Sequence, residues 1–328
     1  MNFDNISAEQ FNENFMNIID DPAKIKEAAQ AGSRYVRMKL REEGVMRRYF
    51  GDLMERVTTE DPRYQIDPEN SDSGYMLLDR EPDSYAMKMT MRGEPEAEYI
   101  QGDKWIVPFL KYGSPVFEKN EMELKNIRIP ITDIIRQNVI LDMQQQEDQY
   151  FFKIIEAAVN MTGNVYNSTK SYFQKDDLTK LFNMIDTQRL SAATIVMSRA
   201  TLNDAYQWNH TEVGSLIETV VEDGVEQLRL GGKRLITTSN TDVIKPGNVY
   251  VFTQPEFFGS AFTLDDPTFW MQKDKDVLKM SSWYYAGFNI GNVKSVAKMQ
   301  LSDASDPEYL STGQKTTNLE DTSDYGSY

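Results

Sequence analysis

The stretch from Tyr85 to Leu110 constrains the fold most, because it has the pattern of a long β-hairpin that is not stable alone. Its first arm, residues 85–92, alternates large apolar residues with small or polar ones, which is typical of a strand with one buried face. Its return arm, residues 104–110, is apolar on both faces and carries Pro108, which suits an edge strand. An isolated two-stranded ribbon is marginal in water. The hairpin must therefore lie either on its own domain or on a neighbouring subunit.

The composition indicates a globular protein and excludes several kinds of site. The 328 residues are 40% hydrophobic and 11% aromatic, enough for one large domain or two ordinary ones. The formal net charge of −16 repels nucleic acid at long range, so a dedicated DNA-binding role is not expected, whereas enclosing DNA needs no sequence-specific contact. The absence of cysteine excludes disulfides, thiolate metal sites and cysteine nucleophiles. We predict neither a signal peptide nor a membrane-spanning helix.

The first fifty residues have the features of a separate N-terminal arm. Asp20-Asp21-Pro22 is a helix-start signal, with proline at a position where its missing N–H is harmless. The segment that follows, residues 24–50, holds the one basic block of this acidic chain. This block is either a solvated helix face or a contact with an acidic neighbour, which would be the surface of another subunit or packaged nucleic acid. Its basic residues are Lys24, Lys26, Arg34, Arg37, Lys39, Arg41, Arg47 and Arg48.

A long helix is predicted after the hairpin. Residues 59–83 are rich in Asp, Pro, Ser and Glu and are expected to be irregular, and residues 116–129 predict a strand. Thr132 or Asp133 then caps a helix that runs without Gly or Pro to about Asn160 and closes near Gly163. At 1.5 Å per residue this spine helix is about 40 Å long. Its apolar stripe comprises Ile140, Met143, Phe151, Ile154 and Ala158.

The C-terminal half predicts a mixed region of helices and strands, so the fold class is α+β. Gly231-Gly232 is a two-residue hairpin signal between strands at 225–230 and 233–238. Residues 302–328 are rich in Ser, Thr, Asp and Gly and are expected to form a flexible tail. Helices are also predicted at 177–186 and 201–208, and strands at 193–197, 248–252, 269–271, 282–290 and 293–301.

No motif for catalysis is found. His210 is the only histidine, and no Gly-x-Ser-x-Gly elbow supplies a serine for it. Gly231-Gly232-Lys233-Arg234 is not a phosphate loop, because Gln227 and Arg234 stand where that motif needs Gly and Ser or Thr. The paired acids Asp176-Asp177, Glu222-Asp223 and Asp265-Asp266 are interpreted as helix caps and loops. A metal site built only from carboxylates stays open as an alternative.

The order of these parts resembles the major capsid proteins of tailed bacteriophages, which have the Hong Kong 97-type fold. Three stretches carry the resemblance, and the resemblance as a whole spans most of residues 35–301. Residues 41–50 are similar to the family's arm leading toward its extended loop, and residues 129–160 to its spine helix. Residues 282–299, with the run Gly287-Phe288-Asn289-Ile290-Gly291-Asn292, are similar to its last strands.

The resemblance implies a Hong Kong 97-like capsid fold in seven segments. Residues 1–50 form the N-terminal arm, 51–82 a connection, and 83–117 the extended β-hairpin loop. Residues 118–171, with the spine helix, and 262–301 form the peripheral domain. Residues 172–261 form the axial domain, and 302–328 the C-terminal tail.

The resemblance also implies a structural role: hexamers and pentamers of an icosahedral phage head that encloses double-stranded DNA without sequence-specific contacts. The protein would be assembled in the cytoplasm of a bacterial host and found in the virion, with no cofactor, no catalytic residue and no membrane contact. Partners would be other copies, a separate scaffolding protein, a portal and a decoration protein. The expected intersubunit contacts are Met87, Met89, Met91, Arg92, Trp105, Val107, Phe109, Arg34, Arg37, Arg47 and Arg48.

Three other functions remain open at this point. An encapsulin-type nanocompartment shell has the same fold and encloses an enzyme cargo. A carboxylate-metal-dependent hydrolase would gather its acids only in three dimensions. A binding protein of no particular class is the third. Lys88, Lys104 and Lys111 could take part in an intersubunit cross-link, but no partner for them is apparent, and none is predicted.

Overall fold

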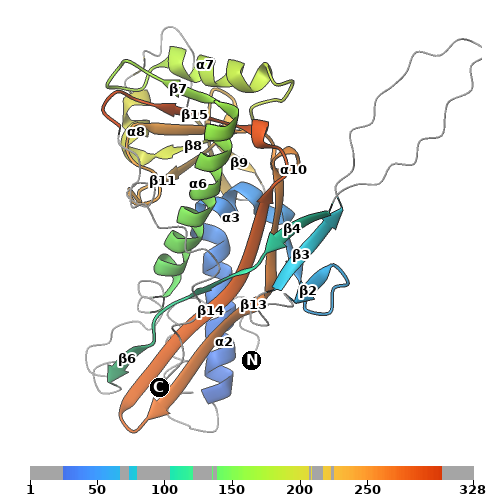
Figure 1. Cartoon of the computed structure of the whole chain (residues 1–328). Helices are drawn as coiled ribbons and strands as arrows, with labels where there is room; N and C mark the ends of the chain where they lie inside the picture. Colours follow the sequence, from blue (N-terminus) through green and yellow to red (C-terminus); the bar gives the residue numbers. More distant parts are fainter. Residues whose placement is uncertain are drawn as a thin grey trace, which may run out of the picture.

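A computed structural model describes residues 25–66, 74–79, 104–120, 135, 139–206, 208, 217–222 and 225–304, with residues 37–43, 217–222 and 225–227 described by their backbone alone. Residues 85–92, His210 and the segment beyond residue 304 lie outside the described residues. Figure 1 shows an elongated arrangement, with one sheet at one end and a long β-hairpin extending toward the other. No helix in the described part is both long and apolar enough to cross a membrane.

A five-stranded sheet, here called the long sheet, forms the extended part of the molecule. Its strands run in the order β1, β13, β14, β5, and β6 pairs with another part of β14. Strand β1 is parallel to β13, and the other pairs are antiparallel. The bounds are β1 Met54–Val57, β5 Leu110–Gly113, β6 Phe117–Asn120, β13 Gly259–Asp274 and β14 Val277–Ile290.

Strand β13 is much longer than the sequence predicts. The register shifts between Leu264 and Thr268, where Asp265 has a φ of 55°. A bulge absorbs extra residues without ending a strand. Asp265-Asp266-Pro267 therefore interrupts the alternating pattern and the pairing only locally, and pairing with β14 resumes at Thr268, which is why the strand predicted at 269–271 was too short.

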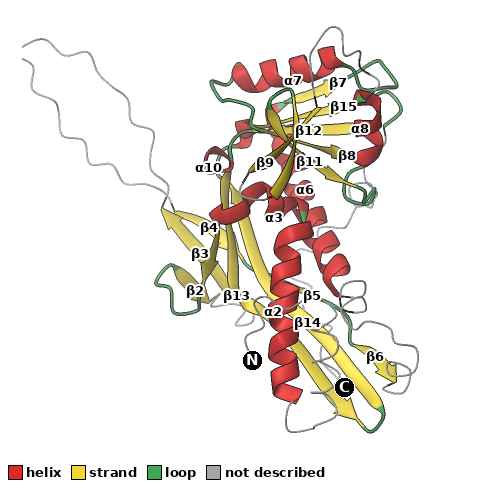
Figure 2. Ribbon diagram, turned by 180° about the vertical axis from the view of Figure 1, so that it is seen from behind, coloured by secondary structure: helices red, strands yellow, loops and turns green. Residues whose placement is uncertain are grey.

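Helix α2 (Ile25–Glu43) packs along β13, as the two views in Figures 1 and 2 agree. Ala28, Ala31 and Val36 are buried on the side that faces the sheet. The Ser33 hydroxyl oxygen accepts a hydrogen bond of 2.9 Å from the backbone N–H of Phe269. The first part of the predicted basic arm is thus a helix attached to its own chain.

A seven-stranded sheet forms the other end of the molecule, in the order β7, β15, β12, β8, β11, β10, β9. The predicted hairpin at Gly231-Gly232 is confirmed: β10 and β11 are antiparallel neighbours, and both glycines have a positive φ. Strand β15 pairs with β12 in this sheet. The strands are β7 Val165–Asn167, β8 Thr194–Ser198, β9 Ile217–Glu222, β10 Val225–Leu230, β11 Lys233–Thr238, β12 Asn248–Phe252 and β15 Val296–Gln300.

The long predicted helix is present as α6, Leu141–Thr162, and it ends where expected. Gly163 is left-handed, with a φ of 69°, and its N–H bonds to the carbonyl oxygen of Val159. Phe151, Phe152 and Ile155 are fully buried in a core that includes residues of both large sheets. Helix α6 therefore joins the seven-stranded sheet to the long sheet.

Short helices complete the fold around these layers. Helix α3 (Val45–Phe50) contacts both α2 and α6. The 3₁₀ segment η2 (Gly51–Leu53) connects it to β1. Helices α7 (Lys175–Asp186) and α8 (Arg199–Ala205) belong to the seven-stranded end, close to their predicted positions. Helix α10 (Pro255–Phe258) precedes β13, and the 3₁₀ segment η4 (Val293–Ser295) precedes β15.

A three-stranded sheet, here called the small sheet, corrects one prediction. It consists of β2 (Tyr64–Ile66), β3 (Gly74–Asp79) and β4 (Lys104–Pro108). Two of these strands lie in residues 59–83, which were expected to be irregular. The described partner of the return arm is β3, in antiparallel register. Strand β3 is short and bounded by polar residues, so its pattern was too brief to stand out.

The small sheet rests on β14 at Gly287, and this contact gives a first prediction. A Cβ atom at position 287 would lie 2.6 Å from the backbone oxygen of Pro108, which cannot move like a flexible side chain. Gly287→Ala is expected to destabilise the protein by about 1–3 kcal/mol, the usual cost of overpacking. At Gly113, in the neighbouring strand, a Cβ would be 3.5 Å from Trp283, an ordinary contact.

The matched variant for this test is therefore Gly113→Ala, and urea denaturation compares the two. Gly287→Ala should lower the denaturation midpoint clearly more than Gly113→Ala. Equal midpoints would show that the small sheet is not held against β14 as described.

Candidate functional site

A buried polar junction connects helix α3 to the spine helix α6. The guanidinium group of Arg47 donates two hydrogen bonds to Glu147, from Nε at 2.8 Å and from the second nitrogen at 3.1 Å. The hydroxyl of Tyr284 on β14 donates to the same carboxylate at 2.9 Å. Burial opposes the charge of Arg47, but Glu147 and Tyr284 raise the pKa of Arg47 above its ordinary value. Arg47 is thus a cation inside the protein.

The neighbouring acid, Asp148, caps helix α3 from a position 103 residues away in sequence. Its two oxygens accept hydrogen bonds from the backbone N–H groups of Val45 at 2.9 Å and Met46 at 2.8 Å. Gly44, at the cap position, has no side chain that could do this. Burial raises the pKa of Asp148 to about 7, although the two N–H groups oppose this shift.

A third buried acid, Glu156, fixes the opposite end of α6 to the seven-stranded sheet. Lys298 on β15 forms an ion pair with Glu156, with 2.8 Å between nitrogen and oxygen, and both side chains are buried. The hydroxyl of Tyr250 on β12 donates to the same carboxylate. The three acids therefore contact α3, the long sheet and the seven-stranded sheet.

Sequence reasoning missed these three acids, although a signal was present. Buried positions on α6 recur every three or four residues, and the buried polar residues have the same spacing as the buried apolar ones. Extending the apolar stripe without regard to residue type would have placed all three carboxylates inside. The buried positions are Met143, Gln144, Glu147, Asp148, Phe151, Phe152, Ile155, Glu156, Ala158 and Val159.

The predicted arginine contacts fall into two groups. Arg47 and Arg48 were expected to pair with an adjacent copy, which stays a prediction, and the structure shows contacts of both within the chain. Arg47 bonds to Glu147, and Arg48 donates to the backbone oxygen of Thr237 on β11 at 2.8 Å. Arg34 is exposed on α2, and Arg37 lies in the same helix with only its backbone described. Contact of Arg34 and Arg37 with another copy stays a prediction.

The predicted hairpin contacts also have partners within the chain. Val107 and Phe109 are buried in a cluster with residues of β1, β3 and β13, so they hold the small sheet to their own chain. Their contact with a second copy stays a prediction. Trp105 is half-buried. Met87, Met89, Met91 and Arg92 lie outside the described residues.

The opposite face of the small sheet, here called the outer face, presents apolar side chains to solvent. Tyr75 is paired with Pro108, and Leu77 with Ile106, so all four residues share this face. Ile106 is 61% exposed, Pro108 is exposed, and Tyr75 and Leu77 are half-buried. An apolar strip of this kind on a sheet surface is typical of a protein–protein contact.

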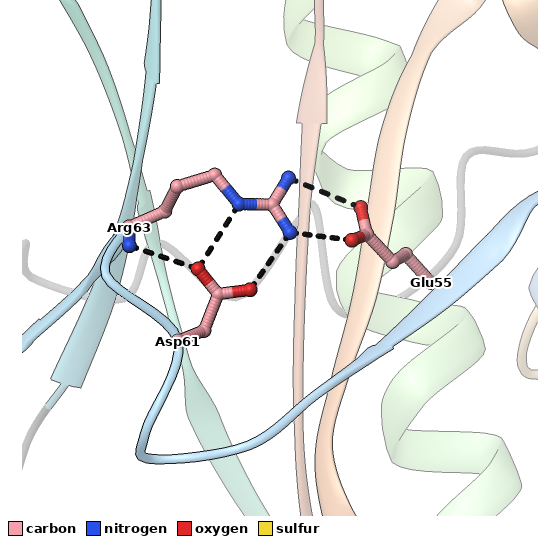
Figure 3. Close-up of polar contacts among 3 residues, drawn as sticks. All are labelled: Glu55, Asp61 and Arg63. Carbon is pink, nitrogen blue, oxygen red and sulfur yellow. Dashed lines mark hydrogen bonds and ion pairs between the residues drawn. The ribbon is translucent and has the colours of Figure 1, made fainter.

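A cluster of charged side chains beside the small sheet is exposed to solvent, unlike the buried ion pair of Arg47 and Glu147. Arg63 binds the carboxylates of Glu55 and Asp61, as Figure 3 shows. Hydrogen bonds from Arg63 lower the pKa of Asp61. All three side chains are solvent-accessible, and such surface pairs contribute little to stability because water and salt screen them. Within the described residues, no three or more His, Cys, Asp or Glu side chains are grouped to hold a metal ion.

Comparisons with known proteins give matches by structure alone, since no family model and no curated protein sequence matches the chain. A virus-like particle protein from Pyrococcus furiosus aligns with a TM-score of 0.52 at 11% identity, covering 84% of this chain and 100% of that one. A structure from Microbacterium phage Oxtober96 has a TM-score of 0.51 at 10% identity, covering 76% of this chain and 89% of that one. The capsid of cyanophage P-SCSP1u has a TM-score of 0.50 at 11% identity, with coverages of 77% and 88%.

The chain has the fold of capsid-type shell proteins. The resemblance to tailed-phage capsid proteins inferred from the sequence is therefore confirmed at the level of the fold. Two of the three similar structures are named as shells, one a phage capsid and one a virus-like particle. Because unrelated functions share folds, the fold alone does not assign the function.

The buried junction yields a second prediction. Glu147→Gln keeps the shape of the side chain but leaves the cation of Arg47 buried without a counter-charge. Breaking a buried ion pair in this way costs about 3–5 kcal/mol. We therefore expect a large drop in the free energy of unfolding, measured by urea denaturation.

The control is Arg63→Gln, which removes an arginine with two carboxylate partners at the surface. It should leave the denaturation midpoint close to that of the wild type, because the exposed cluster is screened. If both variants lower the midpoint equally, the Arg47–Glu147 pair is not the structural junction described.

Proposed function

We propose that this chain is a major capsid protein that self-assembles into the hexamers and pentamers of an icosahedral phage head. The observation that carries the proposal is the likeness of the fold to capsid-type shells. It extends over 76–84% of this chain and over 88–100% of the three compared chains. A match that spans nearly the whole of those chains supports a common architecture and not merely a shared motif.

The outer face of the small sheet supports assembly from the physical side. Ile106, Leu77, Pro108 and Tyr75 would lose apolar surface to water if a second copy covered them. Such burial is worth roughly 25 cal/mol per Å². The same contact repeated around each capsomer would add up, so a modest patch suffices for a large shell.

The segments implied by the resemblance have a place in this proposal. Residues 83–117 would form the extended loop that lies over a neighbouring copy, with the outer face of the small sheet at its base. Residues 172–261 would meet at the centre of each capsomer, and residues 118–171 and 262–301 would form the surrounding peripheral domain. Because β15 pairs with β12, residues 296–300 would share a sheet with the proposed axial domain.

The charge of the chain agrees with a wall around packaged double-stranded DNA. A formal net charge of −16 disfavours adhesion of DNA to the protein at long range. The proposal includes assembly in the cytoplasm of a bacterial host, a separate scaffolding protein, a portal and a decoration protein as partners, and a place in the virion. It assigns no catalytic role.

A second candidate is a protein compartment of encapsulin type. The observation that favours it is the match to the virus-like particle protein from Pyrococcus furiosus, which is covered over its full length. The two candidates share a self-assembling shell and differ in what the shell contains.

Negative-stain electron microscopy of the purified protein, with light scattering for its mass, tests the proposal. Closed shells, tubes or capsomer rings are expected, alone or after co-expression with the neighbouring genes of its source. Nucleic acid of defined length inside the shells would favour the phage head, and a protein cargo the compartment. A protein that stays monomeric under all these conditions contradicts the proposal.

Substitution on the outer face gives a third prediction. Ile106→Asp places a charge where the apolar contact is proposed and should abolish assembly. Because Ile106 is 61% exposed, the variant should still fold and melt close to the wild-type temperature. Light scattering measures assembly, and circular dichroism measures folding.

The conservative variant Ile106→Leu is the matched control and should assemble like the wild type. Normal assembly of Ile106→Asp would remove the outer face from the interface. A strongly lowered melting temperature of Ile106→Asp would show that the residue supports its own subunit instead.

A further inference from the structure

We propose that a cavity between the small sheet and the long sheet binds an arginine side chain of a second copy of this chain, and that this arginine is Arg34. The inference rests on the proposed function, because it names one contact by which copies of the chain would assemble. It begins from the cavity, whose walls come from both sheets, and from the place of Arg34 on the other face of the long sheet.

The cavity has a volume of about 250 Å³ and lies where the bulge of β13 meets the small sheet. Its size falls between the roughly 150 Å³ that accepts a benzene molecule and the roughly 300–1,000 Å³ of sites for drug-sized ligands. It therefore suits a single long side chain better than a large ligand. Its aromatic lining consists of Tyr64, Phe109, Trp283 and Tyr285.

Two carboxylates, Asp265 and Asp266, also line the cavity, and only one of them has a cation. Asp266 forms an ion pair of 2.9 Å with Arg56. Asp265 makes no hydrogen bond or ion pair with a described residue. Its φ of 55° is a left-handed backbone conformation, which is uncommon for a residue other than glycine. Bulges are found where a strand redirects a side chain, so the cavity gains a carboxylate that awaits a donor.

This combination of aromatic rings and an unpaired carboxylate favours a guanidinium group. A guanidinium stacks on aromatic faces, donates hydrogen bonds to a carboxylate and is more weakly hydrated than an ammonium group. An anionic group would be repelled by Asp265, and a purely apolar one would leave it without a donor. The rings already attract a cation, since Nζ of Lys111 lies 5.4 Å from the ring centre of Trp283 and 5.9 Å from that of Tyr285. Lys111 is exposed on a flexible stem, so an entering guanidinium can displace it.

Arg34 is placed to enter such a cavity on another copy and not on its own. It is exposed on α2 and makes no hydrogen bond or ion pair with a described residue. Helix α2 packs on the face of the long sheet that holds Tyr284, whereas the small sheet packs on the face that holds Leu264 and Tyr285. Successive side chains of a strand point to opposite faces. Figure 2 shows α2 lying over the long sheet. Arg34 and the cavity therefore belong to opposite faces of one sheet.

Arg34 and the cavity also lie at the same level of β13. The hydroxyl of Ser33, the residue before Arg34, accepts its hydrogen bond from Phe269, which directly follows the cavity residue Thr268. Copies placed side by side by a rotation would bring the α2 face of one against the small-sheet face of the next. Head-to-tail contacts of this kind close into rings. Pairing an unpaired arginine with an unpaired carboxylate would select this orientation among acidic copies that otherwise repel each other.

Exchange of the two charges tests the contact in the full chain, with shells counted by electron microscopy and mass measured by light scattering. Asp265→Arg and Arg34→Asp should each lower the yield of shells by about tenfold or more, because each places like charges opposite one another. The double variant should restore assembly, because the pair is formed again with its charges exchanged. Both residues are exposed, so circular dichroism should show folded chains throughout.

The control is Arg199→Asp, which changes an arginine exposed on α8 at the seven-stranded end. It should not restore assembly of Asp265→Arg. Any backbone strain at position 265 is the same in the single and double variants, so restoration by Arg34→Asp reports charge pairing. Normal assembly of a folded Asp265→Arg variant, or a folded double variant that assembles no better than it does, overturns the proposal.

A binding measurement keeps the test decisive if Asp265→Arg does not fold or if the wild type does not assemble. Ethylguanidinium chloride is added to unassembled protein, with potassium chloride at the same concentration as the reference. A saturable change in tryptophan fluorescence is expected, because Trp283 lines the cavity. The change should be absent in Asp265→Asn, whose side chain tolerates the left-handed backbone.

The two measurements separate this inference from the proposed function. Shells without saturable binding of ethylguanidinium would overturn the cavity contact and leave the proposed function standing. Saturable binding that depends on Asp265, in a protein that never assembles, would support the site and contradict the proposed function.

Discussion

Three carboxylates buried on one face of helix α6 are the constraint on which the rest of the structure depends. A buried charge is costly unless a partner and further hydrogen bonds satisfy it. Glu147 finds its partners on helix α3 and strand β14, Asp148 at the start of α3, and Glu156 on strands β12 and β15. Apolar packing between α6 and the sheets would tolerate small slips, whereas these pairings permit only one register.

This arrangement decides which residues remain for contact with other molecules. The junction uses Arg47 and Arg48 inside the chain, although the sequence presents them as part of one basic block. The buried side of the small sheet uses Val107 and Phe109 in the same way. The outer face, with Ile106 at its centre, is left exposed next to a rigid support, which suits a contact made many times in a shell.

The sequence predicted the parts of the fold that depend on local patterns. The end of the spine helix at Gly163 and the hairpin at Gly231-Gly232 were both correct, because each rests on a glycine with a positive φ. The resemblance to phage capsid proteins was also confirmed at the level of the fold. The parts that depend on distant pairing were not predictable in the same way. Strand β3 is recognisable only beside β4, and the partners of the α6 acids, Arg47, Tyr284 and Lys298, are known only from the structure.

The outer face also could not be assigned from sequence. The return arm of the hairpin is apolar on both faces, and the pattern alone does not say which face its own domain buries. The structure assigns Val107 to the interior and Ile106 to the surface. The candidate for contact with another copy on this strand is therefore Ile106, which the sequence analysis did not select.

The central claim is that Ile106 and the outer face around it meet a second copy of the chain. Since the chain has no cysteine, Ile106→Cys provides a single position for a photoactivated cross-linker. Assembled particles carrying this label should give chain-to-chain cross-links on illumination, with the second copy identified by mass spectrometry. Particles that assemble normally but give only monomeric chains, with the label still open to solvent, would contradict the account.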